Sequence, residues 1–263
     1  MDFSALPETV KKVIRPVYYK VLYWQIRLRN FSYLFQGKKP RLQDPKKIPI
    51  IINNRNRVST LKLLIEALER RGYYNIYIID NNSTYPPLLE YYENCKYPVF
   101  RLNQNIGHLA IWKTDIYRQF VSDYYVYTDS DVVPIEECPD DFMDVFLTAL
   151  RADKKLQKVG FSLKIDDLPD TFKDKNKVIE WEKKFFERKA SPMFYRASVD
   201  TTFALYRPGM KGGASYLKMY RSDYPYQARH LPWYIDSKNL SEEEAFYISS
   251  ASTSTHWTKG LSK

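Results

Sequence analysis

The sequence predicts an α/β fold, in which a sheet with parallel strands is covered by helices on both faces. Three observations support this. From residue 48 onward, short apolar segments alternate with amphipathic ones. Each of the first four apolar segments ends in Asn or Asp. The hydrophobic content of 44% over 263 residues supplies a core for one large domain or two small ones.

The first half alternates strand and helix. Residues 48–52 are a short apolar strand, and residues 58–71 are a helix that ends at Gly72 and carries leucines and an isoleucine on one face. The next expected elements are a strand at 75–79, a helix at 85–94, a strand at 97–102, a helix at 107–121 and a strand at 124–128.

The second half is less regular. Its expected elements are a helix at 140–155, a strand at 158–165, a charged helix at 177–189, a strand at 199–206, a loop-like stretch at 209–234 and a helix at 241–251. Isolated Asn and Asp residues are common turn formers. Four strands that end in them at one edge indicate a binding rim, because ligands of parallel sheets lie at the carboxyl ends of the strands.

The fourth strand leads into Asp129-Ser130-Asp131. Two carboxylates two residues apart at the end of a buried strand offer oxygen ligands to a hard divalent cation. The chain has neither a G-x-G-x-x-G nor a G-x-x-x-x-G-K-[ST] motif, which argues against dinucleotide oxidoreductases and P-loop phosphotransferases. A metal held by the acidic pair is then the natural way to neutralise a bound diphosphate.

The two cysteines, Cys95 and Cys138, form no framework, so a disulfide scaffold or zinc site is not indicated and a reducing compartment fits. Of the net charge of +10, +8 lies in residues 1–47, where eleven basic residues face three acidic ones. Within that arm and linker, residues 8–30 have the stripe of a basic amphipathic helix, which suits an anionic membrane surface or simple packing on the domain. No nucleic-acid motif accompanies the charge.

Several ordered segments carry a resemblance to a known family. They are Asn53-Asn54-Arg55, the strand end at 78–83, the segment 103–107, the D-x-D motif at 129–131, and the segments 199–207 and 230–234. With these, residues 48–257 resemble GT-A glycosyltransferases, specifically a family 2-like group of bacterial type. The resemblance implies a GT-A (Rossmann-like) mixed sheet at 48–263, with a nucleotide-sugar-binding half at 48–131 and an acceptor-binding half at 132–263.

The resemblance also implies a nucleotide-sugar donor, with a UDP-sugar expected, and a Mn²⁺ or Mg²⁺ ion. The nucleoside and phosphates are then expected beside Asn53, Arg55, Asp80, Asn105 and Gly107, with the start of the 107–121 helix favouring the phosphates. Asp129 is expected to face the ribose or the metal, Asp131 to bind the metal directly, and His256 to complete the metal shell.

Three carboxylates are candidates for the catalytic base that an inverting transferase needs. Asp200 lies inside an expected strand, where aspartate is disfavoured. Glu243 and Glu244 open the last helix and resemble the acidic motif of inverting GT-A enzymes, although the usual Glu-Asp pair is Glu-Glu here. Ser241 and Glu244 also fit a capping box, which favours Glu243 for function.

The sequence is therefore interpreted as a metal-dependent, hexosyltransferase-type enzyme in surface polysaccharide or glycoconjugate synthesis. It is expected to be inverting, with a glycan or lipid-linked acceptor, and to lie on the cytoplasmic, inner face of a membrane. One alternative is a nucleotidyltransferase, which would need a Gly-rich loop after the first strand that 53–57 lacks. The other is a non-catalytic carbohydrate- or membrane-binding protein on the same scaffold.

Overall fold

The computed structural model describes residues 44–199, 202–212 and 218–250, together with single positions between residues 7 and 28. Its first half contains η1 (Pro45–Lys47), β1 (Ile50–Asn54), α2 (Ser59–Arg70), β2 (Ile76–Asp80), α3 (Pro86–Glu93), β3 (Val99–Arg101), η2 (Ala110–Lys113), α4 (Tyr117–Phe120), β4 (Tyr125–Asp129) and β5 (Val132–Pro134). Its second half contains α5 (Phe142–Ala152), β6 (Lys158–Gly160), β7 (Ser162–Leu163), α6 (Lys175–Lys183), η3 (Lys184–Phe186), β8 (Lys189–Ser191), β9 (Phe194–Arg196), β10 (Ala204–Tyr206), β11 (Met219–Ser222), β12 (Gln227–His230), η4 (Leu231–Trp233) and α7 (Glu242–Ser250).

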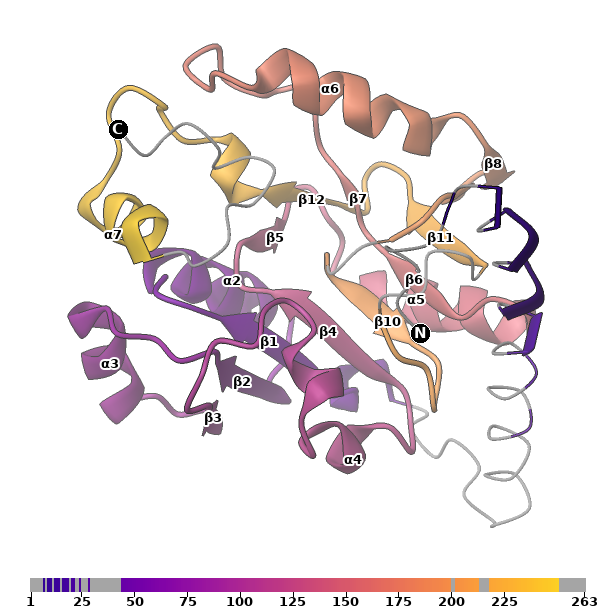
Figure 1. Cartoon of the computed structure of the whole chain (residues 1–263), viewed down its shortest axis with the longest axis horizontal. Helices are drawn as coiled ribbons and strands as arrows, with labels where there is room; N and C mark the ends of the chain where they lie inside the picture. Colours follow the sequence, from indigo (N-terminus) through magenta and orange to yellow (C-terminus); the bar gives the residue numbers. More distant parts are fainter. Residues whose placement is uncertain are drawn as a thin grey trace.

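The expected α/β architecture, a mixed sheet flanked by helices, is confirmed (Figure 1). The strand order of the large sheet is β3-β2-β1-β4-β10-β6-β11-β9-β8. Its first four strands are parallel, and β10 joins β4 antiparallel. A second sheet has the order β5-β12-β7. The parallel part is therefore the half that sequence alternation predicted, and the antiparallel strands come from the second half.

Strand β1 is buried along its whole length, and its side chains alternate between two cores. Ile50 and Ile52 pack in one hydrophobic cluster with the apolar faces of α2 and α5. Ile51 packs in a second cluster with residues of η2 and α4. Because successive side chains of a strand point to opposite faces, one continuous apolar run serves both layers.

Two sequence expectations are wrong: the single helix expected over 107–121 and the loop-like stretch expected at 209–234. Instead of one helix over 107–121, the chain forms η2 and the short α4, because Thr114 between them is extended. Trp112 Nε1 donates to the Tyr125 hydroxyl at 3.0 Å, and the Tyr127 hydroxyl donates to the His108 carbonyl at 2.9 Å. These contacts hold the segment against the sheet. The expected loop contains β11 and β12.

Two expected strands differ in extent. The 158–165 strand divides at Phe161, since β6 belongs to the large sheet and β7 to the small one. Of the strand expected at 199–206, only β10 is a strand among the described residues. The last helix, α7, agrees with its expectation within a residue at each end. Within the described part of the chain, no helix has the length and apolarity needed to cross a bilayer.

Candidate active site at the carboxyl ends of the strands

The polar ends of the parallel strands meet at one edge of the sheet, as the sequence predicted. In the strand register, Asn54 lies opposite Asp80 and Asn53 lies opposite Asp129. Asn53 Nδ2 donates to Asp129 Oδ1 at 3.2 Å. The first, second and fourth strands therefore place their terminal amide and carboxylate groups side by side.

The turn between the two acidic residues is anchored to β1. The Ser130 backbone N–H donates to the Asn53 carbonyl at 3.1 Å, and the Ser130 hydroxyl donates to Asn54 Oδ1 at 2.7 Å. These bonds set the position of Asp131, whose residue surface is only 9% exposed. The middle residue of the D-x-D motif thus has a structural task, which is to hold both carboxylates at the rim.

Arg57 lies against this acidic pair and was not among the residues singled out from the sequence. Its Nη1 is 2.5 Å from Asp131 Oδ2, and its Nη2 is 2.7 Å from Glu244 Oε1. The guanidinium also stacks 3.7 Å from the centroid of the Tyr247 ring. Burial would lower the pKa of Arg57, but the two carboxylates outweigh it and raise that pKa above its usual value. The group is therefore a permanent cation.

The two glutamates of α7 take different places from those expected. The Glu243 carboxylate accepts from the backbone N–H of Val58 at 2.9 Å, from the N–H of Ser59 at 3.1 Å, and from the Ser59 hydroxyl. It caps the start of α2, which has no side-chain cap of its own. The Glu244 backbone N–H donates to the Ser241 hydroxyl at 3.2 Å, but its carboxylate pairs with Arg57 rather than closing a capping box.

Further contacts hold α7 against the loop between β1 and α2. Figure 1 shows α7 close to this loop. Arg55 Nη2 donates to the Ser250 carbonyl at 2.6 Å, and Asn56 Nδ2 donates to the Ser250 hydroxyl at 2.8 Å. Arg55, expected beside the nucleoside, thus contacts the end of α7. Helix α7, the last described helix, therefore lies beside the rim at the carboxyl end of β1.

Asp80 lies at the rim but is almost wholly enclosed. Its side chain accepts from the Ser83 backbone N–H at 3.2 Å and forms an ion pair with Arg101 at 3.5 Å. The neighbouring Asn81 donates from Nδ2 to the Gly107 carbonyl at 3.0 Å. Asn105 Oδ1 accepts from the Gly107 N–H at 3.0 Å. Asn105 and Gly107 are therefore tied to the end of β2.

Gly107 does not begin a helix. It has φ 81, a conformation that favours glycine, and the next helical element is the four-residue η2. The expectation that a helix N-terminus at Gly107 would favour phosphates is therefore wrong. Asp200 and His256 lie outside the described residues.

His230, at the end of β12, is brought to the acidic pair by the fold. Its Nε2 is 3.7 Å from Asp131 Oδ1, and the Leu231 backbone N–H donates to the Asp131 carbonyl at 2.8 Å. The His230 ring packs edge-to-face on Trp233, with 4.7 Å between ring centroids. In the sequence, residues 230–234 are one of the segments that carry the resemblance, and the histidine expected to bind the metal was His256 rather than His230.

The residues at the rim fit a hard divalent cation in part. Asp131 Oδ1 is buried and accepts no hydrogen bond, which is the state of a carboxylate oxygen prepared for a cation. Among the described residues no group of three Asp, Glu, His or Cys side chains forms a cage. A cation held by Asp129 and Asp131 would therefore need oxygen ligands from a bound phosphate or from water.

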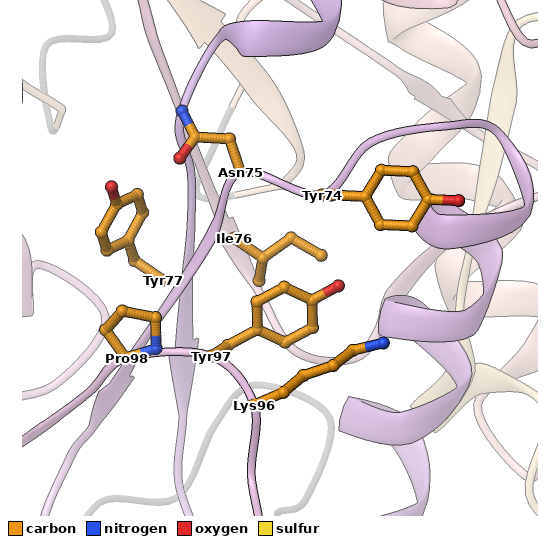
Figure 2. Close-up of a pocket in the computed structure, with 7 residues that line it drawn as sticks. All are labelled: Tyr74, Asn75, Ile76, Tyr77, Lys96, Tyr97 and Pro98. Carbon is orange, nitrogen blue, oxygen red and sulfur yellow. The ribbon is translucent and has the colours of Figure 1, made fainter.

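A cavity of ≈ 330 Å³ lies away from this rim (Figure 2). It is lined by Tyr74, Asn75, Ile76, Tyr77, Lys96, Tyr97 and Pro98, which surround the amino ends of β2 and β3. The carboxylates of the rim are at the opposite ends of these strands. The chemistry-bearing groups and this cavity therefore belong to different edges of the sheet.

No family model matches the chain, and no curated protein matches it. Solved structures do. A crystal structure of S. aureus TarS, residues 1–349, matches at 13% identity and a TM-score of 0.38, covering 62% of this chain and 47% of that one. GalNAc-T7 with UDP, GalNAc and Mn²⁺ matches at 12% identity and a TM-score of 0.46, covering 70% and 43%. A cytidylyltransferase from Leptospira borgpetersenii matches at 13% identity and a TM-score of 0.33, covering 54% and 72%.

Glycosyltransferases and a cytidylyltransferase are thus among the structures to which this chain is similar. The overlap is partial, and the chain spans a little under half the length of the first two matched proteins. What this chain does must be argued from its own residues.

Proposed function

We propose that this protein is a metal-dependent glycosyltransferase that moves a sugar from a nucleotide-sugar, with UDP as the expected nucleotide, to a hydroxyl acceptor. The observation that carries the proposal is the meeting of Asn53, Asp129 and Asp131 at one rim, with a buried Asp131 oxygen that accepts no hydrogen bond. A carboxylate pair at the end of a parallel strand is suited to a cation that accompanies a diphosphate.

The donor would lie along the ends of β1, β2 and β4. Asn53, Arg55 and Asp80 are proposed to contact the nucleoside, because amide, guanidinium and carboxylate groups match ribose hydroxyls and base edges. Asn105 and Gly107, which are half-buried at the end of β2, are proposed to border the donor without a helix end. Asp129 and Asp131 are proposed to hold the Mn²⁺ or Mg²⁺ ion, with His256 or the nearby His230 as a further ligand.

When bound, the ion would supply Lewis-acid stabilisation of the charge that develops on the departing diphosphate. The acceptor hydroxyl needs a group that takes its proton. Glu244 is the proposed base among the described carboxylates, since it faces the acidic pair through Arg57. Glu243 is less suited, because three donors at the start of α2 already occupy its carboxylate. Asp200 remains a proposed alternative. An inverting outcome is proposed because an inverting transferase needs a carboxylate base of this kind.

The test is donor turnover with a panel of nucleotide-sugars, with and without Mn²⁺, on the wild type and on Asp131→Asn. This substitution keeps the side-chain shape and removes the charge. Asp115→Asn is the matched control, because the Asp115 side chain is 86% exposed and its ion pair is with a neighbouring arginine, Arg118. Metal-dependent turnover that Asp131→Asn abolishes and Asp115→Asn retains supports the proposal. Turnover in Asp131→Asn equal to the wild type contradicts it.

The arm at residues 8–30 is proposed to bring the enzyme to an anionic membrane surface on the cytoplasmic side, where a lipid-linked or glycan acceptor is assembled. Its described positions are helical, and their apolar side chains include Val13, Val17, Trp24 and Leu28, exposed at 71%, 62%, 52% and 64%. Such side chains beside lysines and arginines are typical of interfacial helices. Co-sedimentation with anionic but not zwitterionic vesicles, lost on removal of residues 1–43, is the expected result; equal binding to both contradicts it.

A further inference from the structure

Arg57 lies where the acidic pair meets α7, and the proposed function gives it no role of its own beyond joining Glu244 to that pair. The residue is 4% exposed, and its guanidinium spans two carboxylates from distant parts of the chain. A buried guanidinium in a fork between carboxylates has a fixed geometry and a fixed charge. It therefore affects anything else that binds to Asp131.

The charge at this point is only partly balanced before any ligand arrives, because one guanidinium faces two carboxylates and leaves a net charge of −1 for the three groups. Arg57 offsets one of the two carboxylates that it contacts, and only one Asp131 oxygen, Oδ1, lacks a hydrogen-bond donor. A divalent cation entering beside Asp131 would face the Arg57 charge across a few ångströms in a poorly hydrated site. Like charges at that distance repel strongly where the dielectric constant is low. A bare ion should therefore bind less tightly there than it would without Arg57.

A nucleoside diphosphate changes this balance, because it brings two or more negative charges and several phosphate oxygens. Those oxygens would complete the ligand set that the described residues leave incomplete. Their charge would also offset Arg57 and the ion together. The arrangement thus favours an ion that arrives with, or after, the diphosphate over an ion that binds alone.

We propose that Arg57 is a resident counter-ion that positions Asp131 and Glu244 and prevents tight binding of free metal, so that the acidic pair takes up its cation only together with a nucleoside diphosphate. The inference rests on the proposed function, since it concerns the same site. It assigns to Arg57 a positioning role and a role in selecting the metal–nucleotide complex. It also links the proposed metal ligand on the β4–β5 turn to the proposed base on α7.

The first measurement needs no variant. Mn²⁺ binding to the full chain is followed by calorimetry, with and without UDP. The expected result is that UDP tightens Mn²⁺ binding by about a hundredfold, a coupling at the strong end of the usual range between two sites. If UDP and Mn²⁺ do not bind together at all, the proposed function itself fails. If the chain binds both, but binds Mn²⁺ alone as tightly as it does with UDP, only the inference about Arg57 fails.

The second measurement uses Arg57→Met. Without the guanidinium, Mn²⁺ alone should bind at least about tenfold more tightly. The reason is that the Arg57 charge repels the ion, and a repulsion equivalent to one pKa unit changes an affinity about tenfold. Arg70→Met is the matched control, since it removes the same charge from the far end of α2, where the side chain is 57% exposed. Free-metal affinity should be unchanged in the control. Unchanged or weaker affinity in Arg57→Met overturns the inference.

Arg57→Met leaves two buried carboxylates facing each other, so its folding is checked by circular dichroism. If it does not fold, Arg57→Met combined with Glu244→Gln takes its place, since this pair of changes removes one charge of each sign. The double variant keeps Asp131 intact and should show the same gain in free-metal affinity. A folded double variant with wild-type affinity for Mn²⁺ alone and wild-type coupling to UDP overturns the inference.

Discussion

Replacement of Glu243 tests whether α7 supports the first helix of the domain. In the structure its carboxylate accepts three hydrogen bonds at the start of α2, and the N-cap residue Val58 has no side chain that could do so. Glu243→Ala removes a buried charged acceptor and an N-cap at once. Such losses cost about 2 kcal/mol of unfolding free energy, at the upper end of measured caps.

For a domain of this size, a loss of about 2 kcal/mol lowers the thermal midpoint by roughly 4–8 °C. Glu243→Gln keeps one acceptor oxygen and loses the favourable charge at the helix N-terminus, so about half of that effect is expected. The assay is urea unfolding followed by circular dichroism, with thermal melts in parallel. Glu242→Gln is the control, because Glu242 is the adjacent residue of α7 and is exposed.

The expected order of stability is therefore wild type and Glu242→Gln, then Glu243→Gln, then Glu243→Ala. Equal stability of Glu243→Ala and the wild type would refute the capping role of Glu243. A loss in Glu242→Gln as large as that in Glu243→Gln would show that helix charge alone, rather than the three hydrogen bonds, carries the effect.

Three other predictions concern the second half of the domain. Gly160→Ala should lose about 1–3 kcal/mol in urea unfolding, since a Cβ there would lie 2.7 Å from a backbone carbonyl oxygen; unchanged stability would contradict the packing. Arg221→Met should lose about 3–5 kcal/mol because it removes the guanidinium that pairs with the buried Glu182 carboxylate at 2.6 Å, and adding Glu182→Leu should recover most of the loss. Burial would raise the pKa of Asp153, but the hydrogen bonds from Lys218 and from the Lys155 backbone N–H, together with the Lys218 charge, outweigh it and lower that pKa; the stability that Asp153 contributes is present above its unfolded-state pKa and is lost as pH falls through the lowered value. Thermal melts between about pH 6 and pH 3 should therefore fall less steeply in Asp153→Asn than in the wild type.

The parts of the fold that depend on local pattern were predictable from the sequence. Strands β1, β2 and β4 are apolar runs that end in Asn or Asp, and α2 carries a clear apolar face, so their order and their common rim followed directly. The parallel register then made Asn53 and Asp129 neighbours. These conclusions needed only the geometry of parallel sheets.

The parts that depend on distant partners were not predictable. Arg57 resembles any surface arginine in the sequence, and its two partners lie 74 and 187 residues further on. Strand β11 was missed because the buried Arg221 breaks its apolar pattern, and the partners that satisfy this arginine, Glu182 and the Ser198 carbonyl, are distant in the sequence. The sequence favoured Glu244 for a capping role and Glu243 for function, whereas in the structure Glu243 caps α2 and Glu244 pairs with Arg57. This difference also depends on how α7 packs against the loop before α2.

The contact between His230 and Trp233 gives this protein a natural optical probe. The indole is separated from Asp131 by a single imidazole ring, so a change of charge at the acidic pair alters the surroundings of a chromophore. Trp24 and Trp181 are more than half exposed, whereas Trp233 is 3% exposed, so its emission should lie further to the blue than theirs. Ligand titrations can thus be followed by fluorescence without a label.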